Sequence, residues 1–309
     1  MTRVLVVGEI NVDLILGPYQ VFPAPGREVL VDDAVMTLGS ASAIVATGLA
    51  KLGTSVAFVG LVGADAWGDH CLETMYAVGV DVTRVTRSPS LRTGLTVSIS
   101  SSRDRALVTF LGSIAALGPD DVGTLPLAGF SHLHVSSYYL QSGLRPALPD
   151  LLERARASGL TTSLDPGFDP DERWDGISDL LPRVDVFLPN EVELEGLTGI
   201  ADVGAALEAL QNGHTLTVAK LGARGCAVRV DGALLREAPP TTEPVDTTGA
   251  GDSFNAGFLD AWLRDVDLAR CLRAAAFCGA ASTMGVGGAT AQATRADVEA
   301  YLGADGSGP

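Results

Sequence analysis

The sequence PVDTTGAGDSFNAGF, from Pro244 to Phe258, joins a glycine-rich turn to a helix expected from Asp252 onward. Glycines let backbone N–H groups approach an anion, and the positive end of the following helix adds to that attraction. The turn holds no lysine or arginine, but it places a carboxylate at the start of the helix. That carboxylate is better suited to accept a proton from a hydroxyl than to hold a phosphate. The alternative is that Asp252 only caps the helix.

Such turns lie at the carboxyl ends of parallel strands, and the rest of the sequence predicts a sheet of this kind. Apolar runs typical of buried strands occur at 3–10, 55–63, 132–139, 161–167, 184–190 and 214–222. Helices are predicted at 41–52, 146–157, 191–197, 203–212, 252–264, 267–283 and 295–302. We therefore predict an α/β fold with a doubly wound, mostly parallel sheet flanked by helices. An Asp231-Gly232 turn predicts a hairpin at 226–237.

Two segments depart from this pattern. Residues 14–38 and 93–112 alternate like half-exposed strands, the second around a polar turn at 101–105. We expect them to form a small β-sheet lid inserted into a single domain that spans residues 1–302. Residues 303–309 are expected to form a flexible tail.

Composition limits the functions that the chain could have. The 309 residues carry a formal net charge of −16, which argues against a nucleic-acid partner. No apolar run reaches the roughly 18 residues of a membrane span, and the first residues look like a strand rather than a signal peptide. The four cysteines have no metal-binding spacing and are expected to be reduced. We therefore expect a cytoplasmic protein without membrane contact.

Five motifs, in order, resemble those of the pfkB carbohydrate kinase family, the ribokinase-like kinases. They are GEINVD (8–13), LGSASAIVATGLAKLG (38–53), PNEVELEGLTG (189–199), KLGARG (220–225) and DTTGAGDSFNAGF (246–258). The resemblance runs from about residue 3 to residue 302. It implies a ribokinase-like fold, ATP and Mg²⁺ as cofactors, and phosphorylation of a hydroxyl of a small sugar.

The resemblance also implies roles for residues on the nucleotide side of the site. Asp252 would be the general base. The anion hole would be formed by the backbone of Gly249, Ala250 and Gly251. Asn190 and Glu193 would organise the triphosphate and Mg²⁺, with the glutamate holding the ion through water. The nucleotide phosphates would be bordered by Lys220, Gly222 and Gly225.

Two features of this side leave alternatives open. The family usually has Thr or Ser where Lys220 stands, so the lysine either offsets negative charge near ATP or points away. Asp246 and Thr248 match positions that bind a monovalent cation in some relatives, which makes K⁺ a further candidate cofactor. The alternative for this pair is an ordinary turn in which both side chains cap backbone N–H groups.

The acceptor side departs further from the family. Asn11 and Asp13 match the positions that bind substrate hydroxyls. The usual G-G-x-x-x-N signature is replaced by a segment that begins with Gly39 and Ser40 and ends with Ile44. The usual G-A-N segment is replaced by Gly112, Ser113 and Ile114. Two asparagines that normally face the acceptor are thus isoleucines.

These changes leave two hypotheses for the acceptor. An apolar wall discriminates less sharply than a site that hydrogen-bonds a hydroxyl, and it would suit a nucleoside, which makes a nucleoside kinase the alternative. If Ser40, Ser42 or Ser113 takes over the hydrogen bond, the acceptor is still a small sugar, which is the hypothesis we adopt. A catalytically idle relative that senses a sugar or nucleotide is a third hypothesis, although the intact Asp252 argues against it. Lid sheets often pair in this family, which implies a homodimer.

Further polar residues lie within or at the ends of predicted strands. Asp165 and Asp169, in SLDPGFD, are expected at the catalytic edge of the sheet. His132 and His134 alternate on a predicted strand without any metal-binding spacing, and we expect a structural role for them.

Overall fold

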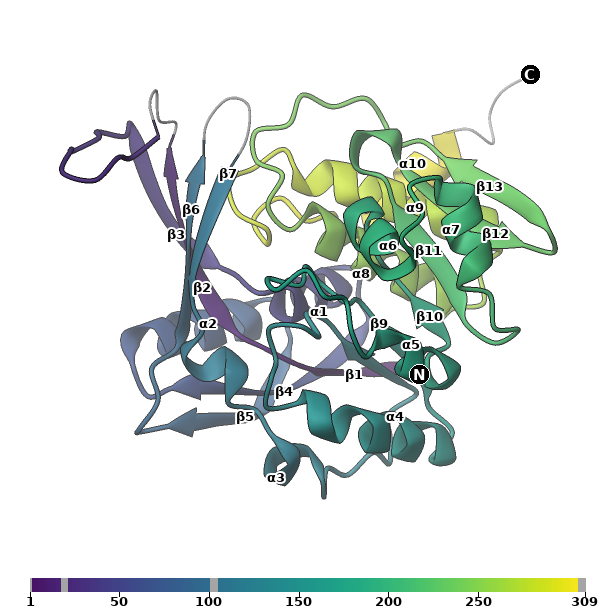
Figure 1. The fold of residues 1–309 in the computed structure, drawn as a ribbon, viewed down its shortest axis with the longest axis horizontal. Helices are drawn as coiled ribbons and strands as arrows, with labels where there is room; N and C mark the ends of the chain where they lie inside the picture. Colours follow the sequence, from purple (N-terminus) through teal and green to yellow (C-terminus); the bar gives the residue numbers. More distant parts are fainter. Residues whose placement is uncertain (1, 18–21, 101–104, 305–309) are drawn as a thin grey trace.

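The computed structural model describes residues 2–17, 22–100 and 105–304. Within these residues the main body is built on a nine-stranded sheet in the order β13-β12-β11-β10-β9-β8-β1-β4-β5 (Figure 1). Its strands are β1 (Arg3–Val7), β4 (Ser55–Gly63), β5 (Asp81–Ser88), β8 (His132–Val135), β9 (Thr161–Leu164), β10 (Val186–Phe187), β11 (Leu216–Lys220), β12 (Cys226–Val230) and β13 (Ala233–Glu237). Adjacent strands are parallel to each other from β5, at one edge of the sheet, as far as β11. β12 and β13 form the predicted antiparallel hairpin, and β12 pairs antiparallel with β11.

Helices cover both faces of this sheet, as the prediction of a doubly wound fold requires. They are α1 (Ala41–Lys51), α2 (Ala66–Ala77), α3 (Pro119–Val122), α4 (Leu148–Ala157), α5 (Ile177–Leu180), α6 (Glu191–Thr198), α7 (Val203–Ala209), α8 (Ala250–Trp262), α9 (Leu268–Ser282) and α10 (Arg295–Ala304). Successive side chains of β1 point to opposite faces of the sheet, each covered by its own hydrophobic core. Val4 and Val6 belong to the core beneath α1, α8 and α9. Leu5 and Val7 belong to the opposite core, beneath α4. A strand buried on both faces explains the near-continuous apolar run.

A second, smaller sheet stands apart from the main body in the order β3-β2-β6-β7. Its strands are β2 (Asn11–Gly17), β3 (Asp33–Leu38), β6 (Gly94–Ser100) and β7 (Arg105–Phe110). β2 begins at Asn11, whereas the expected lid segment begins near residue 14. The predicted polar turn at 101–105 lies outside the described residues except for Arg105, which begins β7.

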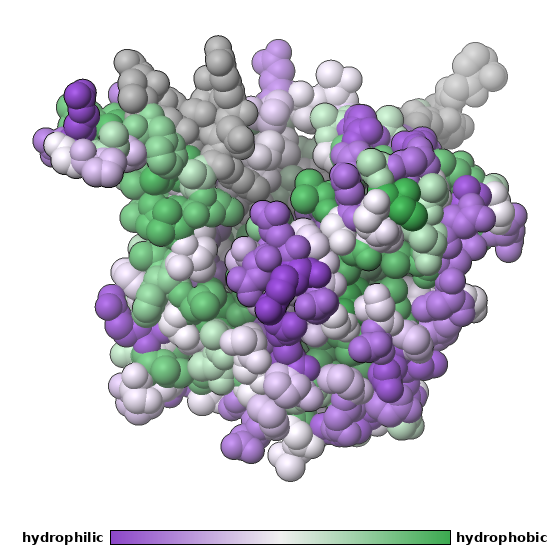
Figure 2. Space-filling view, viewed as in Figure 1, coloured by the Kyte–Doolittle hydropathy of each residue, from purple (hydrophilic) through white to green (hydrophobic). Residues whose placement is uncertain are grey.

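The two faces of the small sheet differ in polarity. One cross-strand row, paired through the register of all four strands, consists of Thr37, Asp13, Thr96 and Thr109. The adjacent row, on the opposite face, consists of Met36, Leu14, Val97 and Val108. Since Met36 and Val108 are exposed, the apolar face is turned toward solvent (Figure 2). The polar face is turned toward the body, where Thr37 contacts Gly287.

Some elements differ from the sequence-based expectations. α2 was not predicted, because only Gly68, Cys71 and Met75 are buried along it and the apolar period is weak. β5 was not predicted either, because this edge strand alternates polar residues on both faces. α10 extends through Ala304, so only residues 305–309 of the expected tail lie outside the described part.

Two general expectations concern the membrane and the cysteines. None of the described helices combines the length and the apolar character that crossing a bilayer demands. All four cysteines are free and buried.

Candidate active site

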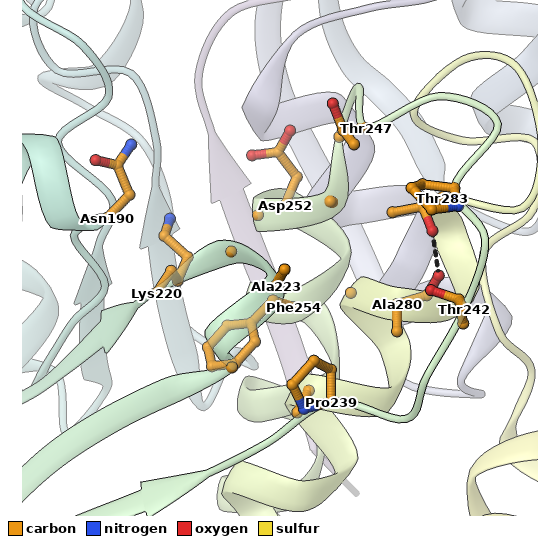
Figure 3. A pocket seen from close by; sticks show the side chains of 18 of the residues that line it. Asn190, Lys220, Ala223, Pro239, Thr242, Thr247, Asp252, Phe254, Ala280 and Thr283 are labelled. Carbon is orange, nitrogen blue, oxygen red and sulfur yellow. Dashed lines mark hydrogen bonds between the residues drawn. The ribbon is translucent and has the colours of Figure 1, made fainter. Parts of the chain in front are cut away.

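Several chain segments meet at the carboxyl edge of the large sheet, around a cavity of about 670 Å³ (Figure 3). Asp165 directly follows β9, Asn190 precedes α6, and Lys220 is the last residue of β11. The glycine turn and Asp252 enter the same cavity from the start of α8. Parallel strands share their carboxyl edge, which is why residues far apart in the sequence come together here.

The glycine turn forms the N-terminus of α8. Gly249 is the N-cap with φ 70°, in the left-handed region that favours glycine. A Cβ at Gly249 would lie 2.5 Å from the Cα of Gly288, so the position is also sterically closed to any side chain. No side chain caps α8. Gly249, Ala250 and Gly251 line the cavity at this helix end, where the N–H of Ala250 donates to the backbone oxygen of Thr247 at 3.3 Å. The N-terminus of a helix attracts anions, so the cavity meets α8 at its electropositive end.

Asp252 is the third residue of α8 and lines the cavity. Burial raises the pKa of its carboxyl to about 7, nearby Asp165 adds to the rise, and Lys220 opposes it. A carboxylate whose pKa lies near neutral pH can both accept and release a proton under ordinary conditions. In Figure 3 the side chains of Asp252, Lys220 and Asn190 are directed toward the same end of the cavity.

Lys220 lies inside the site rather than pointing away from it. Its side chain is buried, and Nζ donates to Oδ2 of Asp165 at 2.5 Å. Nδ2 of Asn255, on α8, donates to the same oxygen at 2.5 Å. Burial acts to lower the pKa of Lys220, but Asp165 and Glu193 outweigh it, so the pKa is raised and the ammonium stays charged.

Asn190 and Glu193 cap each other at the start of α6. The backbone N–H of Asn190 donates to Oε2 of Glu193 at 2.7 Å, and Nδ2 donates to Oε1 at 2.7 Å. In return, the N–H of Glu193 donates to Oδ1 of Asn190 at 2.9 Å. Burial raises the pKa of Glu193 to about 8, and the charge of Asp165 adds to the rise. This is a capping box, with an asparagine in place of the usual Ser or Thr.

The described residues offer no ready-made cage for a metal ion, because no three His, Cys, Asp or Glu side chains cluster suitably. Both carboxylate oxygens of Glu193 already accept hydrogen bonds from Asn190. A magnesium ion that keeps most of its waters and binds substrate phosphates fits this arrangement, whereas an ion needing several direct protein ligands does not.

Asp246 and Thr248 form a hydrogen-bonded turn just before α8. Oδ1 of Asp246 accepts from the backbone N–H and the hydroxyl of Thr248 at 3.0 and 2.8 Å. Oδ2 accepts from the N–H of Gly287 at 2.8 Å. Asp246 thus caps two backbone N–H groups, as in the capped-turn alternative, whereas the hydroxyl of Thr248 donates to Asp246.

Asn11 and Asp13 lie together on β2, at the base of the small sheet. Nδ2 of Asn11 donates to Oδ1 of Asp13 at 2.9 Å. Gly39 lies against both, since a Cβ there would come 2.1 Å from Oδ1 of Asp13. The charge of Asp13 also contributes to the raised pKa of Asp252.

The serines and isoleucines of the acceptor side are all internal. Ser40 donates its hydroxyl hydrogen to the backbone oxygen of Glu9 at 2.5 Å, and Ser42 donates to Oε2 of Glu9 at 2.6 Å. The hydroxyl of Ser113 accepts from the N–H of Gly94 at 3.4 Å. Buried isoleucines pack against glycines, Ile44 on Gly288 and Ile114 on Gly94. Neither isoleucine lines the cavity that Asp252 enters.

Gly222 and Gly225 border the same cavity, where β11 turns into β12. Gly225 has φ 81°, and a Cβ there would come 1.8 Å from the backbone oxygen of Glu237. This close approach of two backbones explains why a glycine is needed at the turn.

Residues 1–295 match the model of the pfkB family carbohydrate kinases. The chain belongs to this family. It is a phosphotransferase, a sugar or nucleoside kinase with the ribokinase-like fold.

Relatives of this kinase differ in substrate. The ATP-dependent ribose-1-phosphate kinase of Halopiger xanaduensis is 30% identical over 308 residues, 98% of each chain. The cytidine kinase of Thermococcus kodakarensis is 29% identical over 287 residues, 88% of this chain and 93% of the relative. Among solved structures, a fructokinase double mutant of Vibrio cholerae O395, with fructose, ADP and a potassium ion bound, is 27% identical with a TM-score of 0.80 over 98% of both chains.

Sequence analysis of this kinase missed two buried polar residues of the site. Glu9 is buried beside α1, where it accepts from Ser42, and burial raises its pKa. Asn255 is completely buried and holds Asp165. Both stand inside motifs that were recognised, in GEINVD and in DTTGAGDSFNAGF, so their place in those motifs was the available signal.

His132 and His134 are buried away from the cavity and form a chain of hydrogen bonds with hydroxyls of neighbouring residues. His132 bonds Thr161 at 2.8 Å and Ser163 at 2.7 Å. His134 bonds the same Ser163 and then Ser136, both at 2.7 Å. The chain joins β8 to β9 across the sheet, so the geometry matches the expected structural role.

Proposed function

We propose that this protein is an ATP-dependent kinase that phosphorylates a hydroxyl of a small sugar. The observation that carries the proposal is the position of Asp252 in the first turn of α8, whose N-terminal residues Gly249, Ala250 and Gly251 line the same cavity. A carboxylate with a pKa of about 7 beside an anion hole suits the attack of an alcohol on a phosphoryl group.

In the proposed reaction the acceptor hydroxyl lies between Asp252 and the terminal phosphoryl group of ATP. The acceptor oxygen forms a bond to the γ-phosphorus as the bond to the bridging oxygen breaks, and that electron pair leaves on ADP. The hydroxyl proton passes to Asp252. The N–H groups of residues 249–251 would stabilise charge on the transferring group, because they are oriented before the reaction begins.

Asn11 and Asp13 are proposed to bind the acceptor hydroxyls. They already contact each other, and one carboxylate beside an amide can serve both as donor and as acceptor. The ribose-1-phosphate kinase relative supports a sugar acceptor. The small sheet is proposed to close over the acceptor as a lid, which would exclude water as a competing phosphoryl acceptor.

A nucleoside acceptor is the second candidate. It is favoured by the internal hydrogen bonds of two serines. The hydroxyl of Ser40 donates to the backbone oxygen of Glu9, and that of Ser42 donates to Oε2 of Glu9. Those serines are therefore poor replacements for the missing asparagines, and the buried Ile44 and Ile114 add no polar group. The cytidine kinase relative gives the same candidate independent support.

Two metal ions enter the proposal. Mg²⁺ would neutralise charge on the triphosphate, with Asn190 and Glu193 contacting it through water. K⁺ is proposed near Asp246 and Thr248, and the potassium ion in the fructokinase structure supports it.

A homodimer through the small sheet and a cytoplasmic location complete the proposal. The outward face of the sheet carries Met36, Val108 and Phe110, all exposed (Figure 2). Exposed apolar patches of this kind mark surfaces of association. The free cysteines and the need for ATP agree with a reducing cytoplasm.

A substrate panel tests the function. Release of ADP would be measured with sugars, sugar phosphates and nucleosides as acceptors in the presence of MgATP, with Asp252→Asn as the inactive control. A sugar with strong selectivity supports the first proposal, and selectivity for a nucleoside replaces it with the second. Absence of turnover with every acceptor, together with a rise in melting temperature on ligand addition, would favour the idle sensing relative.

A further inference from the structure

Among the described residues that line the cavity, Lys220 is the single cationic side chain. Three carboxyl groups line the same cavity: Asp165, Glu193 and Asp252. ATP would bring further negative charge to this place. An ammonium group in a partly desolvated site interacts with such charge much more strongly than it would in water.

The side chain of Lys220 lies next to the anion hole. Its Nζ and Cδ atoms are each 3.6 Å from the point where a Cβ at Gly251 would stand. Gly251 therefore leaves open the space between the lysine and the start of α8. The ammonium is fixed at this point because Nζ donates to Oδ2 of Asp165 at 2.5 Å.

Asp165 is in turn held from the other side. Its Oδ2 accepts from Nδ2 of Asn255, and its Oδ1 accepts from the N–H of Gly167 at 3.0 Å. The carboxylate is buried and cannot turn away without breaking these bonds. A lysine that could take many rotamers in solution is thus oriented in advance, which is the condition for electrostatic catalysis.

We propose that Lys220 is a catalytic residue whose ammonium contacts the transferring phosphoryl group, and that Asp165 is the positioning residue that aims it. The inference rests on the proposed function, because it needs phosphoryl transfer in this cavity. As the acceptor oxygen bonds to the γ-phosphorus and the electron pair leaves on ADP, Lys220 neutralises charge on the equatorial oxygens. It keeps its own protons throughout, and the acceptor proton goes to Asp252.

The structural alternative is that Lys220 only neutralises Asp165. Lys220→Met alone does not decide between the two, because it leaves a buried carboxylate unpaired, which is strongly destabilising. The double variant Lys220→Met, Asp165→Asn removes both charges and keeps the space filled. Asp165→Asn alone completes the set. Each variant is first checked for its melting temperature and then assayed with the acceptor preferred by the wild type.

If Lys220 is catalytic, the double variant folds but its kcat falls by roughly 10²–10³-fold, the usual effect of losing one charge-stabilising donor. Asp165→Asn lowers kcat less, since the ammonium is present but poorly aimed. Once Lys220 is methionine, the further change at Asp165 costs no additional kcat, because a positioning residue acts only through the group it positions. The KM for the acceptor should stay within a few fold.

A double variant with kcat near that of the wild type overturns the inference while leaving the proposed function intact. So does an independent loss from Asp165→Asn in the methionine background. A wild type that turns over no acceptor overturns the proposed function, and the inference falls with it. Wild-type turnover that survives Asp252→Asn removes the assigned base, but the lysine variants still decide the role of Lys220.

Discussion

Gly39 lies directly against the carboxylate of Asp13: a Cβ at position 39 would come 2.1 Å from Oδ1 and 2.5 Å from Nδ2 of Asn11. The glycine is therefore needed to leave room for the pair that we propose as the acceptor site. A single methyl group at this position should displace both side chains.

Gly39→Ala should raise the KM for the acceptor by at least tenfold while changing the KM for ATP little, because the clash is confined to Asn11 and Asp13. Steady-state kinetics with each substrate varied in turn measures both constants. The matched control is Gly118→Ala, where the nearest atom to a new Cβ is 3.7 Å away. An unchanged acceptor KM would show that Asn11 and Asp13 do not bind the acceptor.

Asp252→Asn should lower kcat by roughly 10²–10⁴-fold, the range expected for loss of a general base. The melting temperature at pH 8 should stay the same or rise. The pKa of Asp252 is about 7 in the folded protein, whereas an ordinary aspartate has a pKa of 3.8. The folded protein thus keeps a proton that the unfolded chain releases, so this carboxyl costs stability increasingly as pH rises from about 4 to about 7. Near-normal turnover in the variant would remove the assigned base.

The pH dependence of kcat/KM follows from the same carboxyl. Asp252 accepts a proton only when it is ionised, so kcat/KM should fall about tenfold per pH unit below pH ~7. Burial and the charge of Asp165 hold the pKa high, against Lys220, while Glu9 and Asp13 add to the rise. The profile is measured between pH 5.5 and 9 with saturating MgATP, after checking that activity returns on readjustment to pH 8. A flat profile across this range would contradict the assignment.

Ser40 offers a contrast between two small substitutions. Its backbone has φ 77° and ψ 128°, a conformation that strains any residue except glycine, and its hydroxyl caps α1 by accepting from the N–H of Ala43 at 3.2 Å. Ser40→Ala loses the cap and keeps the strain, whereas Ser40→Gly relieves the strain. The glycine variant should be more stable toward urea than the alanine variant by about 1–3 kcal/mol. Equal unfolding free energies would mean that the surrounding structure relaxes the strain.

The apolar face of the small sheet predicts an assembly. Val108→Asp should convert a homodimer to a monomer, because a charge would be buried at the centre of the paired sheets. Val192→Asp, on α6, is the matched control, since Val192 is 58% exposed and Val108 is 61% exposed. Sedimentation velocity measures the mass of each variant. A monomeric wild type at micromolar concentration would exclude this interface.

Local sequence patterns could predict the edge of the sheet at which the site lies, but not the contacts within it. Asn190 ends a predicted strand, Lys220 lies near the end of another, and the glycine turn before Asp252 was expected at the carboxyl ends of parallel strands. Parallel strands share one carboxyl edge, so the convergence of these residues was foreseeable. The bond between Lys220 and Asp165 was not, because it depends on the side-chain direction at the ends of β9 and β11. The same limit applies to Ser40 and Ser42, whose hydroxyls turn inward to Glu9 rather than toward an acceptor.

The buried histidine chain has a direction. Thr161 donates its hydroxyl hydrogen to the backbone oxygen of Ser131, so it must accept from Nδ1 of His132. Burial lowers the pKa of His132 to about 3 and that of His134 to about 4, so both rings are neutral. Nε2 of His132 then accepts from Ser163, which must accept from Nδ1 of His134. Thr161 thus selects the same tautomer for both rings, with the proton on Nδ1. The hydroxyl of Ser136 then donates its hydrogen to Nε2 of His134.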